Sequence, residues 1–235
     1  MKDYWDFPAV RESFTNTTYG KFQEIDGLLW RVRGGDYLLV SAPTQPFKLP
    51  ENLKRGRSLS YLSGKIGDSI PVKNAGWVYE CEQDWTANRK TRYSLRLAER
   101  DGAVLITPTR DQIRDCFYAW VKDMQTHNPN KMLVKGHYLE MIDHPGFTFL
   151  ACQCGDKVIG ATGFTKDGND GAVCFTKHER GVWWLSRYLW FHSLKSLQIA
   201  GVSSINCGDT ADKLKKELGL KQHRQFKVDF NALHV

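Results

Sequence analysis

Residues 147–177, "FTFLACQCGDKVIGATGFTKDGNDGAVCFTK", contain three short apolar runs separated by two clusters of turn-forming residues. Gly155 and Asp156 form the first cluster, and "KDGND" at residues 166–170 forms the second. Glycine and aspartate favour tight turns, so the stretch predicts three consecutive antiparallel strands. Cys152 and Cys154 share one face of the first strand, where we expect core packing rather than a metal site.

The segments on both sides of this stretch show helical and strand periodicity. A helix is expected from Asp111 to about Met124, with Thr109 or Asp111 as its N-cap, because apolar residues recur there at helical spacing. The other expected elements are a strand at 103–109, a helix at 134–142, a long helix at 182–199, a strand at 202–207, a helix at 211–218 and a strand at 225–230. This order predicts an α+β fold, with a mixed, mostly antiparallel central sheet flanked by helices.

Residues 1–83 are expected to form a smaller unit that precedes this domain, which we place at 84–235. The two alternating runs "LLWRV" (28–32) and "YLLVSA" (37–42) are joined by "RGGDY", a pattern typical of a β-hairpin. The sequence therefore predicts a small, strand-rich N-terminal lobe.

The composition favours an anionic partner. The formal net charge is +7 and the isoelectric point is about 9.1, which suits nucleic acid or a phosphorylated ligand. No apolar run is long enough for a membrane span, and residues 1–10 lack the apolar centre of a signal peptide. We expect a cytoplasmic protein whose six cysteines are reduced.

Positive charge concentrates in "NRKTRYSLRLAERDG", residues 88–102, within a helix expected from about residue 84 to 100. Four arginines lie within a sector of roughly 80° on that helix: Arg89, Arg92, Arg96 and Arg100. Like charges at this spacing repel, and an external phosphate chain would explain them. The alternative is a solvated face whose charges are paired with Glu82, Asp84 and Asp101.

The order of elements over residues 103–230 resembles the GNAT superfamily of N-acyltransferases, and "DKVIGATGF" is similar to its habitual hairpin. The stretch from Arg89 onward resembles the Fem family, the aminoacyl-tRNA-dependent transferases that build peptidoglycan bridges. The matching residues are Arg89, Lys90, Arg92, Tyr93, Arg96, Ala98, Glu99 and Gly102. The resemblance implies an N-terminal lobe that is a partial repeat of the fold, aminoacyl-tRNA as co-substrate and no resident cofactor.

Acyl-CoA-dependent members of the superfamily hold the pyrophosphate with a glycine-rich turn before the long helix. Here the corresponding residues 176–188, "TKHERGVWWLSRY", have a single glycine, Gly181, followed closely by two tryptophans. Bulky side chains hinder the close backbone approach that phosphate needs. The resemblance therefore favours a branch that does not use CoA. His178 and Arg180 are candidate phosphate ligands, with a solvated turn as the alternative.

The superfamily's chemistry occurs where the fourth and fifth strands diverge, so residues at those strand ends are candidates for catalysis. Asn206 and Asp209 follow the fifth strand, although Asp209 also suits an N-cap. In "KGHYLEMIDHPGF", residues 135–147, Tyr138 and Asp143 are candidates for contact with the acceptor amine. No metal site is expected.

We therefore expect an acyltransferase that moves an aminoacyl group from aminoacyl-tRNA to an amine on a peptide, a metabolite or a modified base. One alternative is an acyl-CoA-dependent N-acyltransferase. Its acceptor could be a modified nucleobase in DNA. Another is a non-catalytic nucleic-acid-binding protein of the same fold.

Overall fold

The computed structural model describes residues 1–15, 21–33, 36–40, 43, 57–58, 60–62, 72–128, 136–208 and 212–228. Its helices are η1 (Tyr4–Asp6), α1 (Pro8–Thr15), α2 (Arg89–Arg100), α3 (Arg110–His127), α4 (Gly136–Asp143), α5 (Leu185–Ile199) and α6 (Asp212–Leu218). Its strands are β1 (Lys21–Ile25), β2 (Leu28–Arg33), β3 (Asp36–Leu39), β4 (Arg57–Ser58), β5 (Ser60–Leu62), β6 (Val72–Glu82), β7 (Ala103–Ile106), β8 (Thr148–Cys154), β9 (Lys157–Asp167), β10 (Asp170–His178), β11 (Ser204–Asn206) and β12 (Lys221–Val228).

The strands β8, β9 and β10 form the antiparallel meander that the sequence predicts. Gly155 adopts a φ of +56° in the turn between β8 and β9, a conformation that glycine reaches without strain. Cys152 and Cys154 pack in the same apolar cluster as α5, as expected. The α+β prediction, with a mostly antiparallel sheet between helices, is confirmed.

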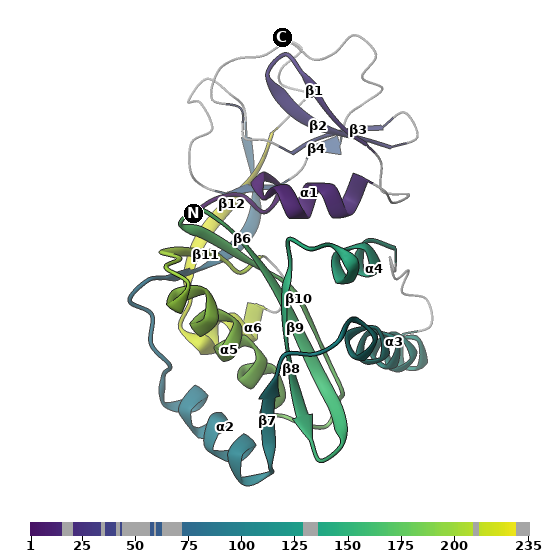
Figure 1. Ribbon diagram of the computed structural model, residues 1–235. Coiled ribbons are helices and arrows are strands. Elements are labelled where there is room, and N and C mark those ends of the chain that lie inside the picture. Colours follow the sequence, from purple (N-terminus) through teal and green to yellow (C-terminus); the bar gives the residue numbers. More distant parts are fainter. Residues whose placement is uncertain are drawn as a thin grey trace.

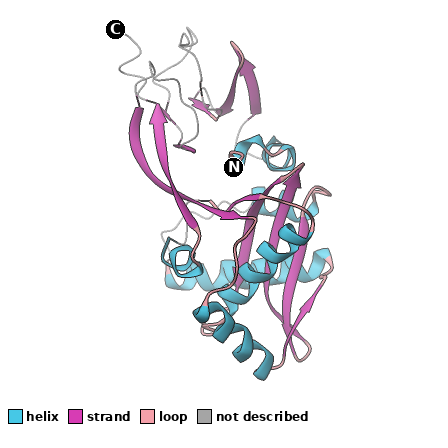
Figure 2. Ribbon diagram, turned by 90° about the vertical axis from the view of Figure 1, so that its left-hand side faces the viewer, coloured by secondary structure: helices cyan, strands magenta, loops and turns pink. Residues whose placement is uncertain are grey.

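The described strands build an eight-stranded sheet in the order β5-β12-β6-β11-β10-β9-β8-β7. Within it, β6 lies between β11 and β12 and pairs antiparallel with both. Residues 72–82 therefore belong to the main sheet, although they precede residue 84. The paired β6 and β12 extend out of the main body toward a second, smaller sheet (Figures 1 and 2).

Helices cover both faces of the main sheet (Figure 1). On one face, α3 and α4 bury Phe117 and Met141 in a cluster that also contains Phe175 of β10. On the other face, α5 buries Leu189 and Leu194. The helix α2 packs against α5 and β7, so it forms an outer layer beside the edge of the sheet.

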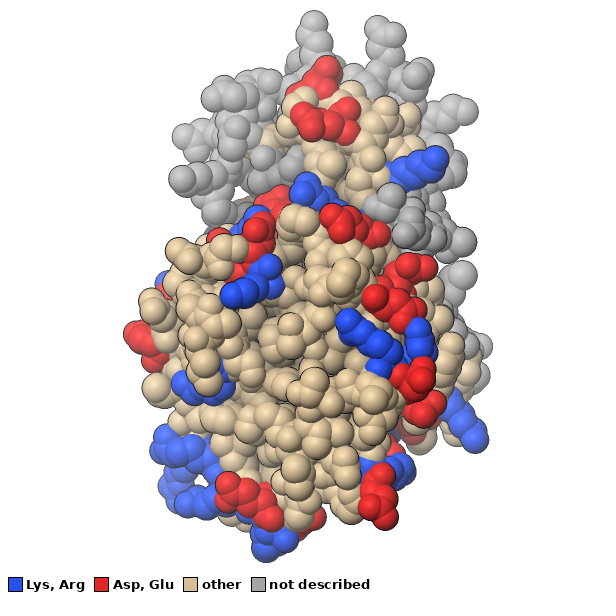
Figure 3. All heavy atoms as spheres, viewed as in Figure 1, with Lys and Arg blue, Asp and Glu red and all other residues tan. Residues whose placement is uncertain are grey.

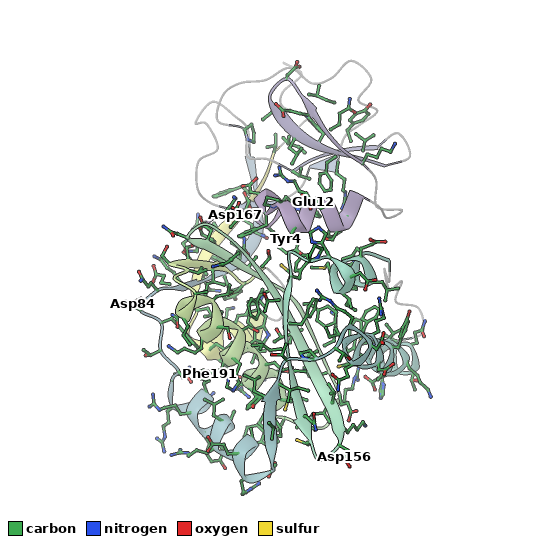
Figure 4. All side chains as sticks on the ribbon, viewed as in Figure 1. Tyr4, Glu12, Asp84, Asp156, Asp167 and Phe191 are labelled. Carbon is green, nitrogen blue, oxygen red and sulfur yellow. The ribbon has the colours of Figure 1, made fainter. Side chains whose placement is uncertain are left out.

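The N-terminal segment joins the small sheet to the main body. The small sheet has the order β1-β2-β3-β4, and its β2–β3 pair is the hairpin that "RGGDY" predicts. The helix α1 packs on α4, where the ring of Phe14 stacks on that of His137 at 4.7 Å between centroids. Glu12, labelled in Figure 4, pairs with His144 at 2.8 Å. Among the described residues, no helix is long and apolar enough to cross a membrane.

Helix starts follow local capping. α3 has Thr109 as its N-cap in a capping box with Gln112, which selects Thr109 over Asp111. α2 begins at Arg89 rather than near residue 84, because the Asn88 side chain accepts from the Thr91 N–H and caps the helix there. α5 begins at Leu185 rather than 182, after a turn closed by a bond from the Leu185 N–H to the Val182 carbonyl.

Candidate functional site

The strands β10 and β11 pair in parallel only between Asp170–Ala172 and Ser204–Asn206. Beyond this point β10 continues along β9 to His178. Cys207 and Gly208 instead exchange backbone hydrogen bonds with Tyr79 of β6. The two strands therefore diverge, and we call the region around Ala172 and Asn206 the divergence point. Strand divergence leaves backbone donors and acceptors of β10 for a ligand to use.

Near the end of β10, Lys177 is enclosed by aromatic rings from three elements. Its Nζ lies 4.1 Å from the ring centroid of Trp120, 4.4 Å from that of Tyr138 and 5.8 Å from that of Phe175. An ammonium over aromatic faces gains roughly 0.5–2 kcal/mol. This aromatic cage holds a positive charge on the α3–α4 side of the sheet, in a position that can attract developing negative charge.

A second lysine is buried beside the residues that follow β11. Lys215 of α6 is 1% exposed, and its Nζ lies 5.3 Å from the ring centroid of Trp190 and 5.7 Å from that of Tyr79. A Cβ at Gly208 would lie 3.7 Å from this Nζ, so the ammonium reaches the end of β11. Lys215 was not among the predicted site residues, and its spacing of three residues from the buried Leu218 is the one sequence signal for its burial.

Buried hydroxyl groups connect α5 to β9 and β10. Thr162 and Ser193 are fully buried, and their hydroxyl oxygens lie 2.7 Å apart. Thr162 also donates to the Phe175 carbonyl at 3.0 Å, and Ser193 donates to the Leu189 carbonyl at 2.9 Å. Because these hydroxyls are satisfied inside the protein, their arrangement braces the floor of the site rather than presenting a nucleophile.

The thiols at the divergence point are in their neutral form. Burial raises the pKa of Cys174, although a hydrogen bond with the Tyr4 side chain opposes this, and burial also raises the pKa of Cys207. Thiolates, not thiols, are the reactive species. The arrangement therefore argues against a reaction that proceeds through either cysteine.

The predicted catalytic residues are not gathered in one place. Tyr138 forms a wall of the Lys177 cage. Asn206 is 2% exposed, donates to the Lys2 carbonyl at 3.1 Å and accepts from the Gly208 N–H at 2.8 Å, so it braces the backbone. Asp143 is exposed at the end of α4 and pairs with Arg114 of α3. Asp209 lies outside the described residues.

The α2 helix presents an exposed arginine face that is only partly neutralised. Lys and Arg side chains gather over this helix at the lower left of Figure 3. Arg100 pairs with Asp101 at 3.0 Å, and Arg92 donates to the Ala87 carbonyl at 2.5 Å. In the part of the chain that the structure describes, Arg89 and Arg96 have no ion pair or hydrogen bond through their side chains.

The alternative was that acidic residues of the protein itself neutralise these arginines. Among the described residues, this is confirmed only for Arg100, which pairs with Asp101. Of the three acidic residues proposed as partners, Glu82 pairs with Lys221 instead, at 2.5 Å. The other predicted phosphate ligands are engaged within the protein. Lys90 lies 3.8 Å from Glu217, and Arg180 pairs with Asp123.

His178 is likewise bound on both ring nitrogens. Its Nε2 lies 2.5 Å from the Ser186 hydroxyl, and its Nδ1 lies 2.8 Å from the Glu179 carbonyl oxygen. These contacts fix the turn that leads from β10 into α5. His178 therefore stabilises this turn with both of its polar atoms.

The two tryptophans of this turn have different environments. Trp184 is 3% exposed, is the N-cap residue of α5, and donates through Nε1 to Asp101 at 2.9 Å. Trp183 is 56% exposed, and its ring centroid lies 5.9 Å from that of Tyr93 on α2. An indole at the N-cap position and a single glycine, Gly181, distinguish this turn from a glycine-rich phosphate cradle.

Comparison with known proteins identifies the fold. No family model matches the sequence, and no curated protein matches it. The structure is similar to FemX, with a TM-score of 0.66 and 10% identity over 99% of this chain and 94% of that one. It is also similar to L-PGS from Bacillus licheniformis, with a TM-score of 0.61 and 10% identity over 99% of this chain and 95% of that one.

A GCN5-related N-acetyltransferase from Kribbella flavida is more distant, with a TM-score of 0.51 and 9% identity over 95% of this chain and 96% of that one. Proteins at such low identity share architecture rather than a common site. The chain therefore has a GNAT-like fold similar to that of FemX, as its element order predicts.

Proposed function

We propose that this protein is a transferase that forms an amide bond, moving an aminoacyl group from aminoacyl-tRNA to an amine acceptor. The observation that carries this proposal is the α2 face, where Arg89 and Arg96 are exposed without a partner in the described residues. Unpaired guanidinium groups at an exposed surface suit a phosphate chain.

We place the reaction beside the part of β10 that lies beyond the divergence point and carries Lys177. The amine nitrogen attacks the ester carbonyl carbon, the carbonyl oxygen takes up negative charge, and the ester C–O bond then breaks to release a ribose hydroxyl. The amine loses one proton, which the released oxygen takes up. We assign Lys177 to the stabilisation of the developing oxyanion, and Tyr138 to contact with the acceptor. Lys215 adds a fixed positive charge near the end of β11.

The turn between β10 and α5 supports aminoacyl-tRNA over acyl-CoA as the donor. Its N-cap residue is the buried Trp184, and the segment Glu179–Trp184 has one glycine. Binding of a pyrophosphate at a helix N-terminus requires close approach to backbone N–H groups, which small residues permit. Acyl-CoA dependence and nucleic-acid binding without transfer are the two alternatives that an experiment must separate.

Transfer is tested by mixing the purified protein with charged tRNA and a panel of amines, and measuring new amides by mass spectrometry. Thermal unfolding is followed in parallel with tRNA, acetyl-CoA and duplex DNA, because a ligand of the folded state raises the unfolding temperature. The proposal expects an amide product and a shift with tRNA. A shift with acetyl-CoA and none with tRNA would overturn it, as would tRNA binding without transfer to any amine.

The contribution of α2 is tested with Arg89→Glu combined with Arg96→Glu. Each lost phosphate contact lowers the slope of log affinity against log salt by about 0.9, so the double variant should lower it by about 2. We expect tRNA affinity at low salt to fall at least about tenfold. The matched control is Lys122→Glu with Lys166→Glu, which changes the same charge at exposed positions on α3 and β9. Equal losses in the two double variants would contradict the assignment.

A further inference from the structure

Two large aromatic side chains contact each other on the outside of the protein. Tyr93 is 52% exposed and Trp183 is 56% exposed, yet their ring centroids lie 5.9 Å apart with an angle of 34° between the ring planes. Tyr93 comes from α2, and Trp183 comes from the turn that connects β10 to α5. Adjacent exposed rings from separate elements form an apolar surface that a ligand can cover.

Arg89 and Arg96, which have no side-chain partner among the described residues, lie on the same helix as Tyr93. Arg89 precedes Tyr93 by four positions and Arg96 follows it by three, and residues at these spacings are neighbours on a helix surface. All three residues are exposed, and on the helix Tyr93 lies between the positions of Arg89 and Arg96. The surface therefore alternates positive charge and aromatic face.

Buried contacts hold Trp183 in place. The neighbouring Trp184 donates to Asp101 at 2.9 Å and packs edge-on against Tyr188 at 5.8 Å between centroids. Gly181 has a φ of +87°, which lets the chain turn tightly before Trp183. Asp101 follows α2 directly, so its bond to Trp184 ties the end of α2 to the turn. The aromatic pair is thus preorganised before any ligand arrives.

This combination of groups matches an unpaired nucleobase on a phosphate chain. Bases stack on aromatic side chains with little regard to sequence, while arginines contact the backbone phosphates. A duplex hides the faces of its bases inside the stack, so aromatic rings bind them only at an unpaired end. Arginines alone would bind duplex and single strand alike, so the aromatic pair selects for an unpaired end.

We propose that Tyr93 and Trp183 form a stacking site for an unpaired base at the single-stranded end of an RNA, with its phosphates on Arg89 and Arg96. This inference rests on the proposed function, because it names the part of the donor that the protein binds. The turn that carries Trp183 begins where β10 ends, at the end of the strand that also carries Lys177. A base stacked here lies at the end of β10 that carries Lys177, the residue assigned to the oxyanion.

The test measures binding of a labelled eight-nucleotide RNA ending in CCA by fluorescence anisotropy. The same RNA annealed to its complement as a blunt duplex is the second probe, and unlabelled CoA is the competitor. We expect Trp183→Ala and Tyr93→Ala each to weaken single-strand binding by about tenfold or more, with duplex binding unchanged. Trp183→Phe keeps an aromatic face and should retain most of the affinity.

The matched control is Tyr118→Ala, which removes a ring of similar exposure, 48%, from α3 on the other face of the sheet. Because Trp183 and Tyr93 are largely exposed, their alanine variants should unfold at temperatures close to that of the wild type. The inference fails if Trp183→Ala binds the single strand as well as wild type does, or if it loses single strand and duplex equally. It also fails if CoA displaces the RNA from wild type and no longer binds Trp183→Ala.

The inference and the proposed function can fail separately. If wild type prefers the single strand, loses that preference in Trp183→Ala and yet transfers no aminoacyl group, the stacking site stands and the transferase proposal fails. If wild type transfers the group and Trp183→Ala does so at the same concentration of RNA, the transferase proposal stands and the stacking site fails.

Discussion

Two strongly charged regions of this molecule differ in how the fold treats their charge. A pocket at the end of β6 is lined by Glu80, Glu82, Gln83, Asp84 and Ser203. There, Glu80 accepts from the Ser204 hydroxyl at 2.5 Å and pairs with His223 at 2.6 Å, while Glu82 pairs with Lys221. On α2, by contrast, Arg89 and Arg96 have no such partner among the described residues.

This comparison shows that charge density alone does not identify a binding surface. Both regions are conspicuous in the sequence, one as a run of acids and the other as a run of bases. Within the described residues, Glu80 and Glu82 are paired with basic side chains whereas Arg89 and Arg96 are not, and balanced charge is typical of structural ion pairs. Three experiments test whether the acidic residues at the end of β6 are paired within the protein while the arginines of α2 are not.

Glu80→Ala should have the largest effect, because Glu80 is 8% exposed and its removal leaves Ser204 and the partly buried His223 without this partner. We expect the free energy of unfolding to fall by about 3 kcal/mol, measured by urea denaturation. Glu82→Ala is the control, since Glu82 and Lys221 are exposed and such pairs contribute about 1 kcal/mol or less. Equal losses in the two variants would show that the acidic pocket is not internally balanced.

Arg89→Glu combined with Arg96→Glu should leave stability nearly unchanged or raise it slightly. The change removes repulsion between like charges and places an acid in the first turn of α2, which the helix dipole favours by up to about 0.5 kcal/mol. Arg187→Glu is the contrast, because Arg187 is largely buried and pairs with Glu217, so about 2 kcal/mol should be lost. Destabilisation of the α2 variant by a similar amount would reveal partners for these arginines.

The smallest effect concerns Asp101, which pairs with Arg100. The hydrogen bond from Trp184, followed by the interaction with Arg100, holds the pKa of Asp101 below its ordinary value of 3.8. A carboxylate with a lowered pKa stabilises the folded state above the ordinary pKa, and this contribution disappears as pH falls through the lowered value. Wild type should therefore be more stable than Asp101→Asn at pH 7 and equal to it at the acid end of a pH series. A difference that does not change with pH would assign the effect to shape rather than charge.

Local sequence predicted most elements correctly, and the errors have identifiable causes. The β8–β10 meander and the Thr109 cap were readable because each depends on residues close together in the sequence. The start of α2 was misplaced because Asn88 caps the helix, while Trp85 is drawn into the core and donates to the Leu218 carbonyl at 2.9 Å. That contact joins residues far apart in the sequence.

The place of the candidate site stays a prediction, and the surroundings of its residues came from the structure. The resemblance predicted a site at the ends of the strands that the structure shows as β10 and β11. Tyr138, predicted from another segment, forms one wall of the Lys177 cage near the end of β10. The resemblance did not predict that the Asn206 side chain is hydrogen-bonded to backbone groups, or that Lys215 is buried. Both facts depend on which segments pack against these side chains.

By itself, the sequence determined the order of the elements, the α+β class and the arginine stripe on one face of α2. These properties follow from hydrophobic period, turn residues and helical geometry, all of which act over a few residues. Tertiary structure alone decided the position of β6 between β11 and β12, the contact of Tyr93 with Trp183, and the pairing of some arginines and not others. The physical reason is that strand pairing, ring contact and charge neutralisation depend on the distance between atoms in space, which separation along the chain does not fix.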